Sequence, residues 1–436
     1  MTPWPVVITP ARALLLLSVV FSSKIILIRC PLQISGSKNK ILFFHRLIQI
    51  SKNVYICYAM LYNLGLIAFY TFATVAGLQI LYYLVFFSRV AFYRRTFETD
   101  SAPEAECSVI ICAKDEELNL QKNLPSVLLQ RYHDKKSPAY EVIVVNDNSE
   151  DDTKYYLRSI EPGYPHYRHI EIKQAAKFIP GKKFPLSMGI RSAKYEYILL
   201  TDADCKPSST YWLSMMSQGF TEGKEIVLGY SPYEKKPGLL NKVIRYETYF
   251  SALQYLSFAL SGVTYMGVGR NLAYKRELFT RHKGFTAHHH IASGDDDLFV
   301  NAAATRDNVS VVINKQAFTY SEPKTTWKKW FQQKTRHMST GKHYRFSHKL
   351  LLGLFSLSHF LFYPAFIASI FYQPMQLYTL GIFGFKLLLQ SVISFMAMRK
   401  LDESDLFKIS WFMDLFMTLY YIVLTPALLF KSKNRW

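Results

Sequence analysis

Residues Tyr197–Cys205 read YILLTDADC, an apolar run that ends directly in two aspartates, Asp202 and Asp204. Two earlier segments have the same form: SVIICA at Ser108–Ala113 precedes KDEE, and EVIVVN at Glu141–Asn146 precedes DNSEDD. Near-continuous apolar runs of this length are typical of strands that helices cover on both faces. The three segments therefore predict buried strands, each followed by acidic residues.

Helical patterns separate these runs along the chain. Strands that alternate with helices predict βαβ units and a mainly parallel sheet, which is an α/β fold. A fourth, shorter strand is expected at His169–Lys173, and the expected helices are Glu117–Gln130, Asp151–Ser159 and Phe184–Ala193.

The acidic residues after the strands are the candidate binding site. In open parallel sheets, ligands bind beyond the carboxyl ends of the strands, so acids from three strand ends should converge on one edge. A single Asp-x-Asp carries little weight, since loops and helix caps are rich in aspartate. Three acidic strand ends together imply a cation, because crowded carboxylates repel one another. Oxygen ligands of this kind suit Mg²⁺ or Mn²⁺.

At this point the chain resembles the family 2 glycosyltransferases of the GT-A type, in their membrane-anchored bacterial form. CSVIICAKDEELNL, VIVVNDNSEDDT and GKKFPLSMGIRSAKYEYILLTDADC are similar to the donor-binding motifs of that family, in the family's order. Downstream, GVGRNLAYKRELF, SGDDDLF and QQKTRH resemble its acceptor-side motifs. The resemblance covers about residues 105 to 345. It implies a GT-A-like nucleotide-sugar-binding domain, here flanked by transmembrane helices.

The resemblance also implies roles for the donor-side residues. Asp147 would contact the nucleobase, and Lys182 would help to hold the nucleotide. Asp204 would coordinate the metal on the diphosphate, while Asp202 would hold the donor sugar or the nucleotide. The turn after the opening strand adds two more donor-binding candidates, Asp115 and Glu117.

On the acceptor side, Asp295 stands where the family has its general base. An inverting transferase needs such a carboxylate to deprotonate the acceptor hydroxyl as it attacks the anomeric carbon. Asp296 is the rival for this role, since Gly294 replaces the glutamate of the family's Glu-Asp pair and three aspartates follow. Gln333 and Arg336 occupy the Gln-x-x-Arg positions, where the arginine would supply charge to the departing diphosphate.

Two further departures from the family pattern bear on function. Asn146 replaces the first aspartate of an Asp-Asp pair, which leaves the charge to Asp147. His337 replaces the tryptophan that processive synthases carry after the arginine, which argues against processive polymer synthesis. His288–His290 could be metal ligands, but adjacent histidines on a loop rarely share one metal, and a polar loop near the acceptor is favoured.

Composition and charge indicate a membrane protein. Half of the 436 residues are hydrophobic, yet mean hydropathy is only +0.04, as expected for apolar segments beside a polar domain. Lys and Arg exceed Asp and Glu by 52 to 32, a net charge of +20. Without a nucleic-acid-binding motif, this excess favours anionic lipids and phosphate-bearing substrates over nucleic acid. Five cysteines without a CxxC pair favour a reducing, cytosolic environment for the polar domain.

Apolar segments lie on both sides of that domain. Tyr62–Phe87 is uncharged and long enough to span a bilayer, and the arginines after it predict a cytosolic C-terminal side. Leu239–Leu260 is amphipathic and allows two interpretations, a core helix or, less favoured, a membrane-surface helix. Three C-terminal segments are candidates, the middle one weakened by Lys386: Leu350–Tyr372, Gln376–Met398 and Phe407–Phe430.

The N-terminal end fits this topology poorly. Ala11–Ile28 is a marginal span that contains Lys24, and a second N-terminal span would place a basic loop on the wrong side of the membrane. We therefore expect the residues before Met60 to be dispensable for activity. The predicted organisation is an N-terminal extension (1–59), a transmembrane anchor (60–90), a nucleotide-sugar-binding half (105–235), an acceptor-side half (236–345) and a C-terminal membrane region of two or three helices (350–436).

Together these patterns predict an inverting glycosyltransferase of the inner membrane with a cytosolic catalytic domain. The donor would be a nucleotide sugar, with uridine favoured by the resemblance, and the sugar a hexose or N-acetylhexosamine of a cell-envelope glycan. The acceptor would be lipid-linked or a glycan presented at the membrane. The alternatives are a processive polysaccharide synthase and a non-catalytic nucleotide-binding membrane protein.

Overall fold

The computed structural model describes residues 37–98, 106–134, 137–173, 181–291 and 293–424. It divides into two compact units, Met1–Leu64 and Gly65–Trp436. The described residues of the first unit are helical and belong to α2 (Ser37–Tyr82). The predicted segment Ala11–Ile28 lies outside the described residues. The contacts and the site described below belong to the second unit.

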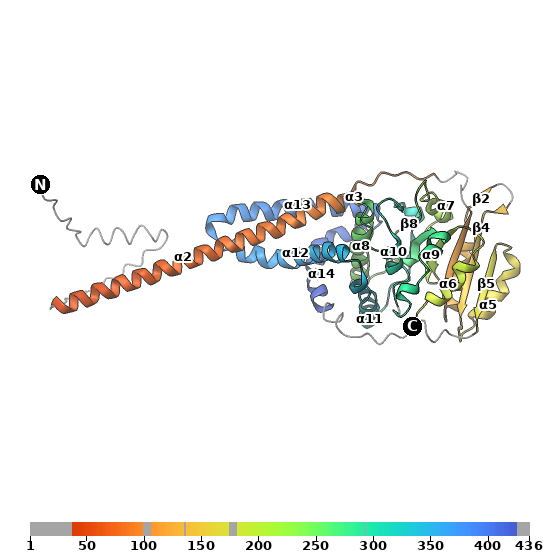
Figure 1. Ribbon diagram of the computed structural model, residues 1–436, viewed down its shortest axis with the longest axis horizontal. Coiled ribbons are helices and arrows are strands. Elements are labelled where there is room, and N and C mark those ends of the chain that lie inside the picture. Colours follow the sequence, from red (N-terminus) through yellow and green to blue (C-terminus); the bar gives the residue numbers. More distant parts are fainter. Residues whose placement is uncertain (1–36, 99–105, 135–136, 174–180, 292, 425–436) are drawn as a thin grey trace. The chain divides into compact units, whose positions relative to one another are not determined.

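A seven-stranded sheet forms the centre of the polar domain (Figure 1). Its strand order is β10-β8-β9-β6-β1-β4-β5. The neighbours of β1 and β4 are parallel to them, whereas β9 runs antiparallel to both β6 and β8. The predicted mainly parallel α/β fold is thus confirmed. The strands are β1 (Cys107–Ala113), β4 (Tyr140–Asp147), β5 (Tyr167–Ile172), β6 (Tyr197–Asp202), β8 (Ile226–Leu228), β9 (Leu272–Lys275) and β10 (Val309–Val311).

Both faces of the sheet are buried, which explains the continuous apolar runs in the sequence. Successive side chains of a strand point to opposite faces, so Val109 and Ile111 enter one core cluster while Ile110 and Cys112 enter the other. The covering helices are α4 (Glu117–Leu128), α5 (Thr153–Ile160), α6 (Lys183–Ser192), α7 (Trp212–Ser217), α9 (Arg276–Arg281) and α10 (Asp297–Ala303).

Two local features place α5 and α6. The helix α5 begins two residues later than the sequence pattern predicts, because the Asp151 carboxylate accepts a hydrogen bond from the Thr153 backbone N–H at 3.1 Å and lies before the helix. The helix α6 lies close against the sheet because of Gly189. A Cβ atom there would stand 2.6 Å from the Ile110 side chain.

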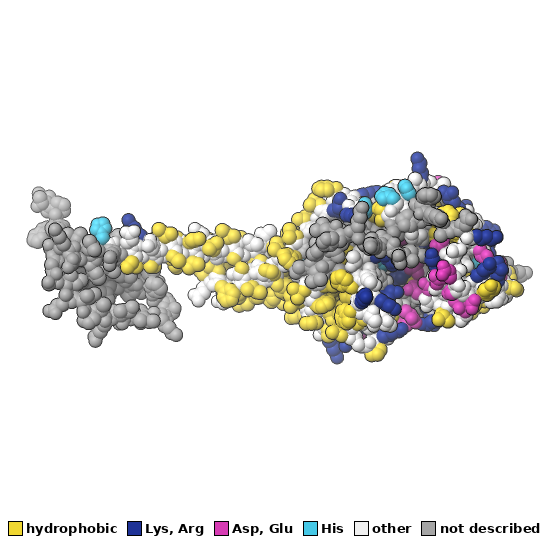
Figure 2. Space-filling view, turned by 90° about the horizontal axis from the view of Figure 1, so that it is seen from below, with side chains coloured by type: hydrophobic (Ala, Val, Ile, Leu, Met, Phe, Trp, Pro, Cys, Tyr) yellow, Lys and Arg dark blue, Asp and Glu magenta, His cyan; other side chains and the backbone are white. Residues whose placement is uncertain are grey.

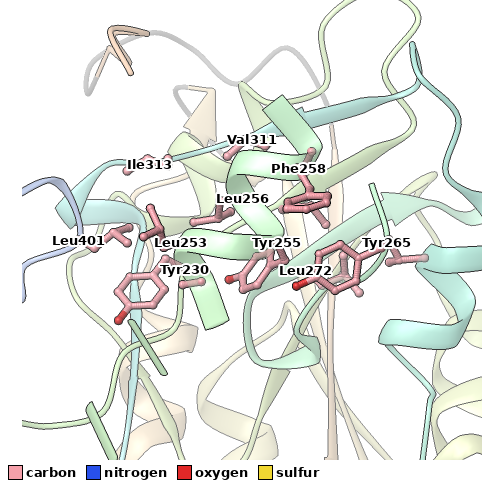
Figure 3. Packing of buried hydrophobic residues seen from close by; sticks show 14 of the residues in the cluster. Tyr230, Leu253, Tyr255, Leu256, Phe258, Tyr265, Leu272, Val311, Ile313 and Leu401 are labelled. Carbon is pink, nitrogen blue, oxygen red and sulfur yellow. The ribbon is translucent and has the colours of Figure 1, made fainter. Parts of the chain in front are cut away.

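The helix α8 (Leu239–Leu260) lies in the core rather than on a surface. Of its 22 residues, 16 are buried, which an amphipathic surface helix would not show. Figure 3 shows Leu253, Leu256 and Phe258 of α8 packed with residues of the sheet and of the segment after α13. The structure therefore supports the core-helix interpretation of this segment.

Apolar helices pack together beside α8. The Phe72 ring of α2 lies 5.8 Å from that of Phe362, and the Phe86 ring stacks at 4.4 Å on Phe258 of α8. Three helices are long and apolar enough to cross a membrane: Gln49–Ala91, Phe346–Ile370 and Gln373–Lys400. The C-terminal helices are α12 (Phe346–Ile370), α13 (Gln376–Lys400) and α14 (Ser410–Leu424); α12 and α13 run side by side (Figure 1).

Two details concern the predicted C-terminal spans. Lys386, which weakened the middle segment as a prediction, is buried in α13 with its ammonium 4.0 Å from the centre of the Phe362 ring. The segment Phe407–Phe430 is described only as far as residue 424, and α14 is not among the candidate spans within the described residues.

The remaining elements are short, apart from α11. They connect the sheet with the apolar helices and complete the edges of the polar domain. Their bounds are α3 (Ser88–Ala91), β2 (His133–Asp134), β3 (Ser137–Pro138), β7 (Cys205–Pro207), β11 (Thr319–Ser321), α11 (Trp327–Met338), the π-helical turn Tyr83–Phe87, and 3₁₀ turns at Glu161–Gly163, Gly269–Asn271, Thr286–His288, Lys315–Ala317, Gly341–His343, Gln373–Met375 and Ser404–Ile409.

Candidate active site

A cavity of about 710 Å³ lies beyond the carboxyl ends of β1 and β6. The turn Gly269–Asn271 and the helices α8 and α11 form its other walls. Figure 2 shows acidic side chains gathered around a hollow on one face, with lysine and arginine beside them. The lining includes eight of the residues that the sequence predicts for the site: Asp115, Lys182, Asp202, Asp204, Asp295, Asp296, Gln333 and Arg336.

The first two strand ends hold each other in place. Asp115 has a left-handed backbone, with φ of 55°. Its backbone N–H donates to Ser149 Oγ at 2.9 Å, and its Oδ1 accepts from the Glu150 N–H at 2.7 Å. These two hydrogen bonds connect the loop after β1 to the loop after β4, and both loops leave the same edge of the sheet.

Two predicted donor-binding residues do not line the cavity. The Glu117 carboxylate accepts a hydrogen bond from Gln121 at 2.9 Å within α4, and its neighbour Glu116 lines the cavity instead. Asp147 ends β4 and is buried. Burial raises the pKa of Asp147, and the nearby Lys114 partly offsets that effect.

The aspartates after β6 form the best metal site among the described residues. Asp202, Asp204 and Cys205 offer ligand atoms that all lie within 4.8 Å of one another, and no histidine joins such a group in the described part of the chain. Burial, and then the charge of Asp202, raises the pKa of Asp204. A divalent cation would relieve this repulsion, so the acidic pair fits the predicted metal.

Lys182, at the start of α6, connects this acidic pair to the far side of the cavity. Its ammonium lies 2.9 Å from Asp202 Oδ1 and 3.1 Å from Asp295 Oδ2. Although burial disfavours the charged ammonium, the two aspartates raise the pKa of Lys182 well above its usual value. Lys182 is therefore a fixed positive charge between the donor side and the acceptor side.

The three aspartates at 295–297 have different environments. Asp296 caps α10, with Oδ1 accepting from the Asp297 N–H at 2.8 Å and Oδ2 from the Gly269 N–H at 2.7 Å. Asp297 accepts from the Thr340 hydroxyl and from Tyr344 Oη. Of the three, Asp295 is the one whose Oδ2 accepts no hydrogen bond from a backbone N–H or a hydroxyl; that oxygen lies 3.1 Å from the Lys182 ammonium. Asp295 thus faces the cation in the cavity, whereas Asp296 and Asp297 are held by neighbouring backbone and hydroxyl groups.

Lys183 holds the loop in front of these aspartates. Its ammonium donates to the backbone carbonyls of His288, Ile291 and Ser293 at 2.9, 2.6 and 2.7 Å, and its side chain is 1% exposed. Burial lowers the pKa of Lys183 to about 8. Sequence analysis had assigned no role to Lys183, because nothing in a GKK run shows which carbonyl groups a lysine will reach.

The helix α11 closes the cavity opposite β6. Its Gln333 and Arg336 line the cavity, as predicted, and Lys334 forms an ion pair with Glu247 of α8. His337 also lines the cavity and is exposed.

Sequence analysis also missed Arg270, which lines the cavity from the turn between α8 and β9. The stretch GVGRN resembles a family motif, but the resemblance implies no role for its arginine. Among the nearby cations, Lys182 lowers the pKa of Asp202 most, and Arg270 lowers it further. Arg270 also partly offsets the burial and the Asp202 charge that raise the pKa of Asp204. The signal in the sequence was a positively charged residue within a family-like motif. Its closeness to the Asp-x-Asp pair is visible only in the fold.

Comparison with known proteins agrees with this geometry. The family model described as glycosyl transferase family 2 matches residues 108–282. Comparison with curated proteins found no match. The solved mannosyltransferase PcManGT from Pyrobaculum calidifontis, in complex with GDP-Man and Mn²⁺, has a TM-score of 0.50 and 18% identity over 82% of this chain and 99% of its own.

A second solved structure, TarS from S. aureus, has a TM-score of 0.41 and 18% identity over 59% of this chain and 44% of its own. That likeness is too weak to support an argument, and the likeness to PcManGT shows the fold alone. The family match, the parallel sheet and the acidic cavity at its carboxyl edge agree with one another. The chain is a glycosyltransferase with the GT-A fold, and its residues 108–282 form a family 2 domain.

Proposed function

We propose that the protein transfers a hexose or N-acetylhexosamine from a nucleotide sugar, with inversion, to an acceptor presented at the membrane. The observation that carries this proposal is the Asp295 carboxylate, which lies in the cavity across Lys182 from the Asp-x-Asp pair. A donor held at Asp202 and Asp204 and an acceptor held near Asp295 would then meet in one cavity.

The transfer step follows from this arrangement. Asp295 accepts the proton of the acceptor hydroxyl as its oxygen bonds to the anomeric carbon. The bond from that carbon to the diphosphate oxygen breaks, and the electron pair stays on the phosphate. Arg336 provides positive charge to the departing diphosphate. Asp202 and Asp204 would hold Mg²⁺ or Mn²⁺, which when bound would supply positive charge to the phosphates.

The resemblance assigns Lys182 to the nucleotide and Asp147 to the nucleobase. Asp115 orders the loop after β1. Asp147 and Glu117 are the weaker candidates, because neither lines the cavity. A uridine nucleotide is the favoured donor. The solved mannosyltransferase was in complex with GDP-Man, so guanosine-diphosphate sugars are the alternative to test.

Presentation of the acceptor at a membrane is supported by α8. Glu247, Thr248 and Ser251 on one side of α8 line the cavity, while Phe250 and Phe258 contact the apolar helices through Phe355 and Phe86. An acceptor on a lipid or a cell-envelope glycan would thus reach the cavity along a helix that also borders the candidate spans. We place the catalytic domain on the cytosolic side of an inner membrane, since Arg94 and Arg95 follow the first span.

A donor panel with three variants tests the proposal. Purified full-length protein is supplied with UDP- and GDP-sugars and Mn²⁺, and release of nucleoside diphosphate is measured. Asp295→Asn should keep donor affinity while turnover falls on the order of 10²-fold, as for loss of a general base. Asp307→Asn, at an exposed aspartate outside the cavity, serves as the matched control.

The outcomes separate the alternatives. If Asp296→Asn loses turnover and Asp295→Asn does not, the base is Asp296. If the wild-type protein releases nucleoside diphosphate from none of the donors in the panel, a non-catalytic nucleotide-binding role is favoured. Products of many lengths from a single acceptor would favour the processive synthase, against which His337 argues.

A further inference from the structure

Arg270 is held by a rigid turn beside the Asp-x-Asp pair. The neighbouring Asn271 is fully buried, and its Nδ2 donates to the carbonyls of Tyr230 and Ala317, both at 2.8 Å. Its Oδ1 accepts from Trp212 Nε1 at 3.0 Å. The Gly269 N–H on the other side of Arg270 donates to Asp296. The backbone of Arg270 is therefore fixed from both sides.

The guanidinium of Arg270 is also fixed, and part of its hydrogen-bonding capacity is unused. Its carbon lies 4.6 Å from the centre of the Tyr233 ring, and Nη2 donates to the Ser231 carbonyl at 3.0 Å. Nη1 is buried and, among the described residues, has no hydrogen-bond partner. A buried donor without a partner costs free energy unless a ligand satisfies it.

The charge of Arg270 differs from that of its neighbours in the cavity. Lys182 is neutralised by Asp202 and Asp295, and Lys334 by Glu247. Within the described part of the chain, Arg270 forms no ion pair with a carboxylate, although it lies close enough to lower the pKa of Asp202. Its charge is therefore available to an anion bound in the cavity.

We propose that Arg270 binds the diphosphate of the nucleotide-sugar donor through its free Nη1, and so acts as a catalytic residue together with Arg336. The inference rests on the proposed function. An arginine stacked on an aromatic ring, with one nitrogen unused, suits a phosphate oxygen. When the bond from the sugar to the diphosphate breaks, the electron pair remains on the phosphate, and Arg270 stabilises that added negative charge.

The test measures nucleotide affinity rather than turnover. Full-length wild type, Arg270→Ala, Arg270→Lys and the control Arg281→Ala are compared with Mn²⁺ present. Arg281 is a matched control because it pairs with Glu225 at the surface, outside the cavity. The probes are UDP and GDP, the corresponding nucleosides, and inorganic pyrophosphate as a competitor.

Arg270→Ala should weaken nucleoside diphosphate and pyrophosphate binding by about 10- to 100-fold, the usual loss for one hydrogen bond to a charged group. Nucleoside affinity should change by less than about twofold, since no phosphate is present. Arg270→Lys should retain part of the affinity, and Arg281→Ala all of it.

Two results would overturn the proposal. Unchanged diphosphate affinity in Arg270→Ala would mean that Nη1 does not contact the phosphates. An equal loss of nucleoside and diphosphate affinity would mean that Arg270 only supports the packing of the turn. Failure of the wild-type protein to bind either diphosphate would instead remove the donor site itself, and this inference with it.

Discussion

The ammonium of Lys182 lies 3.1 Å from the carboxylate of Asp295. The same ammonium lies 2.9 Å from Asp202, so one lysine at the start of α6 joins the donor side of the cavity to the proposed base. Each of the two carboxylates would otherwise face like charges from its neighbours. Lys182 therefore balances the charge of carboxylates on both sides of the cavity.

Replacement of this lysine tests that relationship. Lys182→Met should lower donor affinity and turnover together, each by about 10- to 100-fold, since a charged hydrogen-bonding group is lost on both sides. Steady-state kinetics over a range of donor concentrations measure the two effects. Lys194→Met, at an exposed lysine outside the cavity, should behave as the wild type. Normal kinetics in Lys182→Met would show that the link to Asp295 has no part in the reaction.

Lys183 should affect turnover by a different route. Lys183→Met leaves three carbonyl groups, buried or partly buried, without their donor, which should lower stability by about 1–3 kcal/mol. Because the loop held by Lys183 leads into Asp295, we expect a fall in kcat with little change in the KM for the donor. Thermal unfolding and donor kinetics measure the two parts. A variant that is destabilised but keeps its kcat would give Lys183 a role in folding alone.

Removal of divalent metal should abolish turnover. Burial and the charge of Asp202 raise the pKa of Asp204, and the donor brings further negative charge to the same place. Excess chelator should stop release of nucleoside diphosphate, and added Mn²⁺ or Mg²⁺ should restore it in the wild type but not in Asp204→Asn. Full activity in excess chelator would exclude the metal from the mechanism.

Stability should depend on pH through Asp296. Burial, with Asp295 and Asp297 nearby, raises the pKa of Asp296 to about 7 from its usual value of 3.8. The folded protein thus holds a proton that the unfolded chain releases. The resulting stability is complete below about pH 4 and is lost as the pH rises to about 7.

Asp296→Asn is neutral at every pH and should not show this loss. The melting temperature of the variant minus that of the wild type should therefore rise between pH 5 and 7 and level off above pH 7. The difference is used because other groups titrate in the same range and affect both proteins alike. A difference that stays constant with pH would mean that Asp296 is already ionised at pH 5.

Much of the fold could be predicted from local pattern. The strands β1, β4 and β6 begin and end within one residue of the predicted bounds, because both of their faces are buried and most of their positions are apolar. The strands β8 and β10 were not predicted. Each has only three residues, which is too short for periodicity to appear, and both depend on pairing with distant segments.

The residue types and order of the site could likewise be predicted, since the carboxyl ends of parallel strands meet at one edge whatever their loops contain. That rule brings Asp115, Asp202 and Asp204 to one cavity. It does not say which way a side chain points. Glu116 lines the cavity and Glu117 does not. Successive residues at the start of a helix point in directions about 100° apart around the helix axis.

The sequence by itself determined the α/β sheet, the acidic edge and the family, since these follow from short-range periodicity and from motif order. Only the tertiary structure gives Asp295 and Asp296 different partners, Lys182 for the first and the Gly269 N–H for the second, and only it brings Lys183 to the loop carbonyls and Arg270 to Tyr233. These choices depend on groups far apart in the chain, whose distances are set by packing. A side chain finds its hydrogen-bond partner only after the backbone of both segments has been placed.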